Sequence, residues 1–148
     1  MDDWKMVGKP ALILIHMQHS IMDEKGKLAF LGQGKVAREA GIIPRQQSLL
    51  KGFRAKKLPV IYVNSVADPN ATLSPYGRFF SAIQSIERCN LAGTQDVEVI
   101  PELAPLPGEP VLGNFIFSIF SNSNLEKVLK DNGVKTLVLA GWRRTWPY

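Results

Sequence analysis

Continuous runs of apolar residues are the clearest pattern along this chain. Ala11–Ile15 is apolar at every position, and Pro59–Val63 repeats the pattern after an opening proline. Unbroken apolarity is typical of a strand buried on both faces, as in a parallel sheet, and proline is tolerated at a strand's first position. Between the two runs, Pro44 predicts the start of a helix. Its expected buried stripe is Leu49, Leu50 and Phe53.

The same alternation returns near the end of the sequence. A Pro-rich connector, Ile100–Gly108, leads into an expected short strand at Pro110–Leu112. Ser123–Glu126 has the spacing of a capping box, and Asn132-Gly133 predicts where that helix ends. Lys135–Gly141 then indicates a further strand. Strands and helices that alternate with short links predict right-handed parallel crossovers.

We therefore expect an α/β domain with three layers, α/β/α, around a parallel Rossmann-like sheet. Ligands of such sheets bind beyond the carboxyl ends of the strands. That rule points to four segments: His16–Ser20, Asn64–Asp68, Asn114–Phe120 and Trp142–Tyr148. The stretch around Asp23–Lys27 is expected to be a polar loop, and Phe79–Ile83 a short helix within an irregular region.

Composition narrows the class of protein. The 148 residues suit one domain, 1–148, and a single Cys excludes an internal disulfide and favours a reducing, cytoplasmic setting. No apolar run approaches the roughly 20 residues of a membrane span, and no secretory signal is visible. The net charge of +5, from 18 basic and 13 acidic residues, is scattered. A scattered charge favours a solvated surface over a nucleic-acid partner.

The first strand carries a resemblance to a known family. Leu12-Ile13-Leu14-Ile15-His16-Met17-Gln18 resembles the first strand of the isochorismatase-like cysteine hydrolases, which usually read apolar-apolar-Asp-Met-Gln there. The stretch from Gly93 to Gly141 is similar to the same family, including Phe117-Ser118-Ile119-Phe120 and the closing Thr136–Gly141. The resemblance runs from about Lys9 to Gly141 and implies the three-layer fold described above.

The resemblance also implies a catalytic triad of Asp, Lys and Cys, and this chain departs from it at all three positions. His16 stands at the Asp position, Asn114 at the Lys position and Pro147 at the Cys position. Asn114 is uncharged, and Pro147 has neither a nucleophile nor a backbone N–H. His16 is able to act as a base, in which case activity would change near its usual pKa of about 6.5.

Four further positions are candidates for a substrate pocket: Gln18, Phe117, Ser118 and Trp142. Gln18 matches the family, where it supports the base, and Ser118 keeps the family's Ser-x-Phe pattern. Phe117 fits either an aromatic pocket or core packing. His16 and His19 are three residues apart, but no third ligand has convincing spacing, so neither a metal nor another cofactor is expected. Cys89 is interpreted as a small buried hydrophobic residue.

Three hypotheses follow. The first is a catalytically impaired or incomplete family member, since the family continues beyond the position of Tyr148 with the nucleophile's helix, a strand and another helix. The second is an active hydrolase of an amide, carbamoyl or enol-ether compound, with His16 as base and water as nucleophile. The third is a non-catalytic binding or assembly module. We expect a small-molecule ligand and a homo-oligomer, dimer or tetramer, that buries the open side of the domain.

Overall fold

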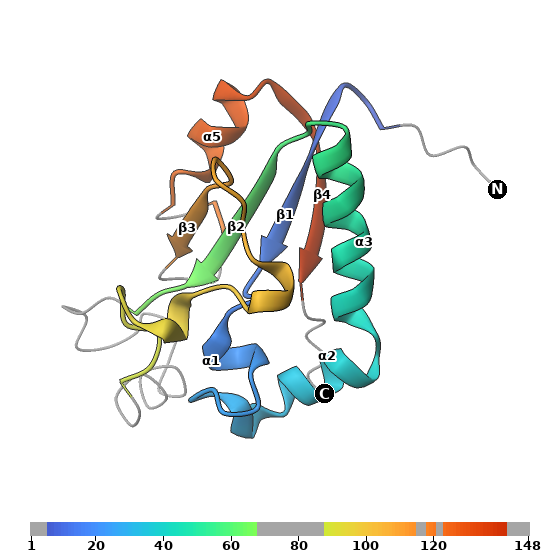
Figure 1. Cartoon of the computed structure of the whole chain (residues 1–148). Helices are drawn as coiled ribbons and strands as arrows, with labels where there is room; N and C mark the ends of the chain where they lie inside the picture. Colours follow the sequence, from blue (N-terminus) through green and yellow to red (C-terminus); the bar gives the residue numbers. More distant parts are fainter. Residues whose placement is uncertain (1–5, 68–87, 115–117, 121–122, 142–148) are drawn as a thin grey trace.

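Four parallel strands form the centre of the protein, as seen in a computed structural model that describes residues 6–67, 88–114, 118–120 and 123–141. The strands are β1 (Lys9–Ile15), β2 (Val60–Ser65), β3 (Val111–Asn114) and β4 (Val134–Gly141). They lie in the order β3-β2-β1-β4, and each neighbouring pair is parallel. All four arrows therefore point toward the same edge of the sheet (Figure 1).

Helices cover both faces of this sheet. Helix α3 (Ile42–Ala55) lies on one face and α5 (Leu125–Asp131) on the other. Shorter elements gather beyond the arrowheads: α1 (His19–Met22), η1 (Ala29–Leu31), α2 (Gln33–Glu39), η2 (Gln95–Val97) and η3 (Pro101–Leu103) (Figure 1). The predicted three-layer α/β/α architecture with a parallel sheet is confirmed.

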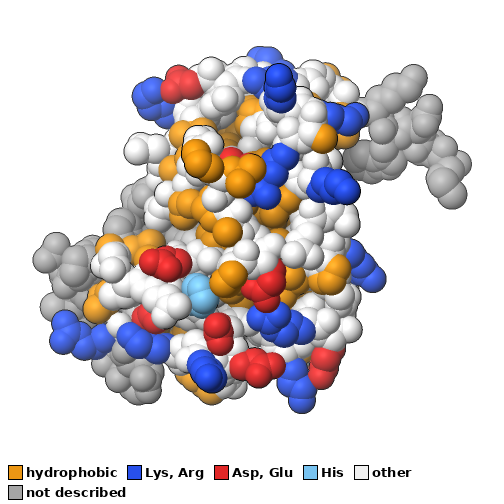
Figure 2. Space-filling view, in the orientation of Figure 1, with side chains coloured by type: hydrophobic (Ala, Val, Ile, Leu, Met, Phe, Trp, Pro, Cys, Tyr) orange, Lys and Arg blue, Asp and Glu red, His pale blue; other side chains and the backbone are white. Residues whose placement is uncertain are grey.

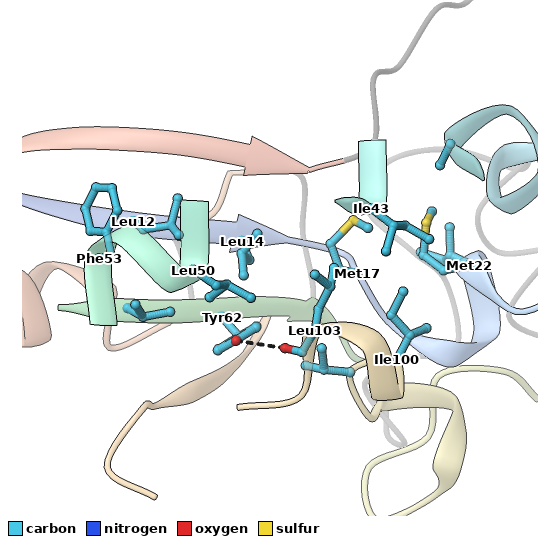
Figure 3. Close-up of a cluster of buried hydrophobic side chains, with 14 of the residues drawn as sticks. Leu12, Leu14, Met17, Met22, Ile43, Leu50, Phe53, Tyr62, Ile100 and Leu103 are labelled. Carbon is cyan, nitrogen blue, oxygen red and sulfur yellow. Dashed lines mark hydrogen bonds between the residues drawn. The ribbon is translucent and has the colours of Figure 1, made fainter. Parts of the chain in front are cut away.

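The unbroken apolarity of β1 follows from its central place between two cores. Leu12 and Leu14 pack against α3 in one buried cluster, together with Tyr62 (Figure 3). Ala11 and Ile13 point the other way, into the cluster that α5 completes with Leu125 and Leu129. Successive strand residues face opposite sides of a sheet, so a strand buried on both sides must be apolar throughout.

One polar group is buried within the α3-side core and is satisfied there. The Tyr62 hydroxyl donates a hydrogen bond of 2.8 Å to the carbonyl oxygen of Leu103 (Figure 3). Burial raises the pKa of Tyr62 far above its usual value. This bond ties η3 to β2, so the connector ahead of β3 is held against the sheet.

Two details of the expected helices are corrected. Helix α3 begins at Ile42, two residues before Pro44, because Gly41 takes a left-handed conformation at φ 64° and starts the helix. Pro44 is still within the first turn, where its missing N–H is not needed. Leu49 is 37% exposed and lies outside the buried stripe that Leu50 and Phe53 form.

The expected capping box also differs. The N-cap residue of α5 is Asn124 rather than Ser123. Ser123 Oγ accepts a hydrogen bond from the Leu125 N–H at 3.3 Å, while Glu126 pairs with Lys130 at 2.7 Å instead of reaching back. The helix ends where the Asn132-Gly133 pair predicted, with Asp131 as its last residue, Asn132 as its C-cap and Gly133 at φ 63° just beyond.

The polar stretch around Asp23–Lys27 is more ordered than expected. A turn there is closed by the Lys25 N–H, which donates to Asp23 Oδ1 at 2.8 Å. The surrounding α1, η1 and α2 have few residues each, too few for a hydrophobic period to show in the sequence. The expected helix at Phe79–Ile83 lies outside the described residues. No helix in the described parts of the chain has the length and apolar character needed to cross a membrane.

Candidate functional site

The carboxyl ends of the strands meet along one edge of the sheet. Ile15 of β1 is in register with Gly141 of β4 and with Val63 of β2, while Ser65 is in register with Asn114. His16 follows β1 directly and Asn114 ends β3, with β2 between them. Two strand spacings separate these positions, about 10 Å. Phe117, Trp142 and Pro147, the other candidates, lie outside the described residues.

His16 turns the chain away from the sheet in an uncommon conformation. Its φ is 54°, in the left-handed region that only a few per cent of non-glycine residues adopt. Its N–H donates to the Val63 carbonyl at 2.8 Å, which fixes the residue at the edge between β1 and β2. This backbone conformation ends β1, and together with the hydrogen bond to Val63 it fixes the direction in which the imidazole leaves the chain.

The imidazole of His16 is uncharged at neutral pH. Burial lowers the pKa of His16 to about 4, from a usual 6.5, because removing the ring from water disfavours the protonated form. Its Nε2 atom is buried and has no hydrogen-bond partner among the described residues. A neutral imidazole nitrogen either donates or accepts, depending on the tautomer. His16 therefore offers one polar atom for a ligand.

Asn114 is buried, with 1% of its surface exposed. Its Nδ2 donates to the carbonyl oxygen of Ser118 at 3.0 Å, so its amide holds the turn that follows β3. The Ser118 residue itself is exposed. Asn114 carries no charge to offer a reacting group, and its side chain has at least one structural role.

Gln18 joins three parts of this edge. Its Oε1 accepts from the Ser65 N–H at 2.7 Å, and its Nε2 lies 3.0 Å from the Ser65 carbonyl oxygen. The same nitrogen is 3.0 Å from Asn90 Oδ1 and 3.1 Å from Ser20 Oγ. The side chain is fully buried and has no access to water, so these hydrogen bonds satisfy its polar atoms instead. Gln18, just after β1, is therefore connected by hydrogen bonds to β2 and to the segment 88–98.

The segment 88–98 has its own polar support. Asn90 is buried with φ 59°, and its N–H donates to Asp96 Oδ2 at 3.1 Å. The same Asp96 oxygen is 2.9 Å from Lys27 Nζ. The sequence reasoning did not single out Asn90 or Asp96. The only local signal was that Asn tolerates the left-handed region, and the adjacent Cys89, fully buried, gave none.

Charges around the edge do not form a metal centre or a single basic region. Within the described ranges, no group of three or more His, Cys, Asp or Glu side chains is placed to hold a metal ion. His19 Nδ1 instead lies 3.3 Å from Asp23 Oδ2. On the face shown in Figure 2, acidic and basic side chains are interspersed.

Comparison with known proteins decides the family. The isochorismatase domain family matches residues 10–143, nearly the whole chain. This chain belongs to the isochorismatase family. Among curated relatives, it is 27% identical over 146 residues to the ureidoacrylate amidohydrolase RutB of Pseudomonas syringae, covering 90% of this chain and 59% of that protein. The family resemblance noted in the sequence is confirmed.

Solved structures show the same fold for this isochorismatase-family chain. The N-carbamoylsarcosine amidase of Thermoplasma acidophilum is 30% identical with a TM-score of 0.69, covering 90% of this chain and 68% of that one. A cysteine hydrolase of Pseudomonas syringae pv. phaseolicola is 27% identical with a TM-score of 0.74, covering 91% and 60%. The chain thus spans about three fifths of the length of the curated relatives it matches.

Proposed function

We propose that this isochorismatase-family domain binds a small ureido compound, through its uncharged ureido group, at the carboxyl edge of its sheet and does not hydrolyse it by thiol chemistry. The observation that carries the proposal is the buried, unprotonated His16, whose Nε2 has no partner among the described residues. A ureido group suits this atom because its carbonyl accepts a hydrogen bond and its N–H groups donate one.

The ligand class comes from the relatives. Ureidoacrylate and N-carbamoylsarcosine, the compounds in their names, share a carbonyl flanked by two nitrogens. An uncharged group of this kind needs no buried counter-ion, which fits an edge where both His16 and Asn114 are neutral.

The residues present explain why hydrolysis is not proposed. A general base works best when its pKa lies near the working pH, and a pKa of about 4 makes His16 a weak base at neutral pH. Asn114 has no positive charge with which to stabilise a developing anion. By sequence, Pro147 supplies no nucleophile.

A second candidate is hydrolysis with His16 as base and water as nucleophile. It is favoured by the same unpartnered Nε2, because the ring is neutral above about pH 4 and Nε2 is able to accept a proton in the tautomer that carries its proton on Nδ1. Burial of the ring changes the expectation drawn from the sequence: the acid limb of a pH–rate profile would lie near pH 4 rather than 6.5.

Calorimetric titration with N-carbamoylsarcosine and ureidoacrylate, together with an assay for released ammonia, tests both candidates. We expect binding without turnover, and about fivefold weaker binding in His16→Gly, since one hydrogen bond contributes about 1 kcal/mol. Glycine accepts the positive φ at this position, and His19→Ala is the control at the other histidine. Turnover that His16→Gly abolishes would establish the second candidate instead. No binding of either compound would refute the first.

A further inference from the structure

The turn between α5 and β4 contains the one Asn-Gly pair of the sequence, Asn132-Gly133. Both residues are exposed. The turn lies at the edge of the sheet where the strands begin, opposite the carboxyl edge that carries His16 (Figure 1). An asparagine side chain has an electrophilic amide carbon, Cγ, and glycine offers the least hindered backbone nitrogen because it has no side chain. The two reacting groups of a cyclic imide therefore stand on neighbouring residues.

We propose that Asn132 is a site of spontaneous deamidation, which the hydrogen bonds at the end of α5 restrain in the folded chain. The backbone nitrogen of Gly133 loses its proton and attacks Cγ of Asn132. The bond from Cγ to Nδ2 then breaks, and the amide leaves as ammonia. Water opens the resulting five-membered imide at either carbonyl, which yields aspartate or isoaspartate at position 132. Water is the only co-reactant.

Two hydrogen bonds keep the reacting atoms apart in the folded chain. The Gly133 N–H donates to the Lys130 carbonyl oxygen at 3.0 Å, so the nitrogen that must attack is engaged in the turn. Asn132 Nδ2 donates to the Val128 carbonyl oxygen at 2.9 Å, which draws the side chain back along the helix. Both bonds must break before Cγ meets the nitrogen of Gly133.

The backbone angles of the turn also oppose the reaction. Asn132 has a ψ of 0°, at which the nitrogen of Gly133 eclipses the nitrogen of Asn132 rather than its Cβ. Ring closure needs the nitrogen on the side of Cβ, so ψ must rotate away from this value. Gly133 has a φ of 63°, the left-handed conformation that closes a helix. Deamidation therefore requires the last turn of α5 to open.

Opening is accessible at this position because α5 has only seven residues, and helix ends open at little cost. The two exposed ion pairs along α5 add little, since such pairs are weak in water. The two hydrogen bonds of the turn are then the main restraint. They predict deamidation about thirtyfold slower in the folded chain than in the unfolded chain.

Deamidation would weaken the end of α5. Aspartate at position 132 loses the amide donor that the Val128 carbonyl accepts. It also adds a carboxylate next to Asp131, at the helix end where the dipole disfavours negative charge. Isoaspartate lengthens the backbone by one carbon ahead of Gly133. Since α5 closes the core on its side of the sheet, the aged chain should unfold at a lower urea concentration than the fresh chain. None of this depends on ureido binding at the opposite edge.

Peptide mass spectrometry of the whole chain, incubated at mildly alkaline pH and sampled over weeks, tests the chemistry. We expect isoaspartate and aspartate at position 132, and about thirtyfold faster formation in urea that unfolds the chain. Asn132→Gln should stay unmodified at this position, because its longer side chain would have to close a six-membered ring.

Lys130→Gly tests the restraint without removing a reacting atom. Glycine is a poor helix former, so the last turn opens more often, and deamidation of the folded chain should be about fivefold faster. The rate in urea should not change. Lys35→Gly is the matched control, because Lys35 is an exposed lysine of α2 that also pairs with a glutamate four residues away. Its rate should equal that of the wild type.

Three results would overturn the proposal. An unmodified residue 132 in the unfolded chain would show that the pair does not cyclise. Aspartate without isoaspartate would show direct hydrolysis of the side chain instead of an imide. Equal rates in the folded and unfolded chains, or in the wild type and Lys130→Gly, would show that the end of α5 does not restrain the reaction.

Discussion

Acidification is expected to destabilise this domain through His16. The folded chain holds the imidazole neutral with a pKa of about 4, whereas the unfolded chain titrates near 6.5. Between these two values the unfolded state binds a proton that the folded state does not. Stability is therefore fully present above pH 6.5 and is lost progressively as the pH falls toward 4.

The size of the effect follows from the shift. At pH 5 the solution is about 1.5 pH units below the unfolded-state pKa of 6.5, so the unfolded chain is protonated while the folded chain is largely not. Each of these units corresponds to 1.36 kcal/mol. Because of His16, the free energy of unfolding should therefore fall by about 2 kcal/mol between pH 7 and pH 5. With a urea m value of about 1–3 kcal/mol/M, the midpoint would fall by about 1 M.

Urea unfolding of the wild type and of His16→Asn at both pH values measures this. Asparagine is uncharged and tolerates the φ of 54°, so the variant should show a much smaller loss between pH 7 and 5. Because pH 5 lies above the usual pKa of the carboxyl groups, their protonation contributes little to either chain. His19→Asn should behave as the wild type.

An equal loss of stability in the wild type and in His16→Asn would refute the reasoning. So would an NMR titration of the folded protein in which the His16 ring protonates near pH 6.5. Either outcome would mean that water reaches Nε2, and the uncharged site on which the proposed function rests would have to be abandoned.

Three further substitutions test the framework around the site, each by urea unfolding. Gln18→Ala should cost about 3 kcal/mol, because it leaves buried backbone groups of β2 without partners. Gly141→Ala should cost about 1–3 kcal/mol, because the added Cβ would stand 2.8 Å from the Ile15 carbonyl oxygen. Burial alone would raise the pKa of Glu109, but hydrogen bonds led by that from Arg54 at 2.8 Å lower it. Glu109→Gln should therefore cost about 1–2 kcal/mol at pH 7 and progressively less as the pH falls below 4.5, where the unfolded chain gains the proton first and the folded carboxylate only at a lower pH.

The architecture was readable from the sequence because burial leaves a local record. A strand covered on both faces must be apolar at every position, and Ala11–Ile15 shows that requirement directly. The end of α5 was readable for a similar reason, since Gly133 marks the left-handed residue that closes a helix. Short elements such as α1 and η2 leave no such record, and they were missed.

The candidate site was only partly readable. The strand ends pointed to segments, and the family resemblance within them singled out His16, Gln18 and Asn114 as the residues to follow. It did not show that burial leaves His16 uncharged, or that Gln18 is held by a segment more than 70 residues away in the chain. Both facts depend on which atoms surround a side chain, and no local pattern encodes those neighbours.

The sequence by itself thus determined the alternation of strands and helices and predicted the edge at which to look for a ligand, and through the family resemblance it predicted the residues His16, Asn114 and Pro147 at the triad positions. Tertiary structure alone decided the protonation of His16 and the network around Gln18. The physical reason is common to these cases. Secondary structure follows from short-range periodicity, whereas pKa values and hydrogen-bond partners are set by residues that meet only after folding.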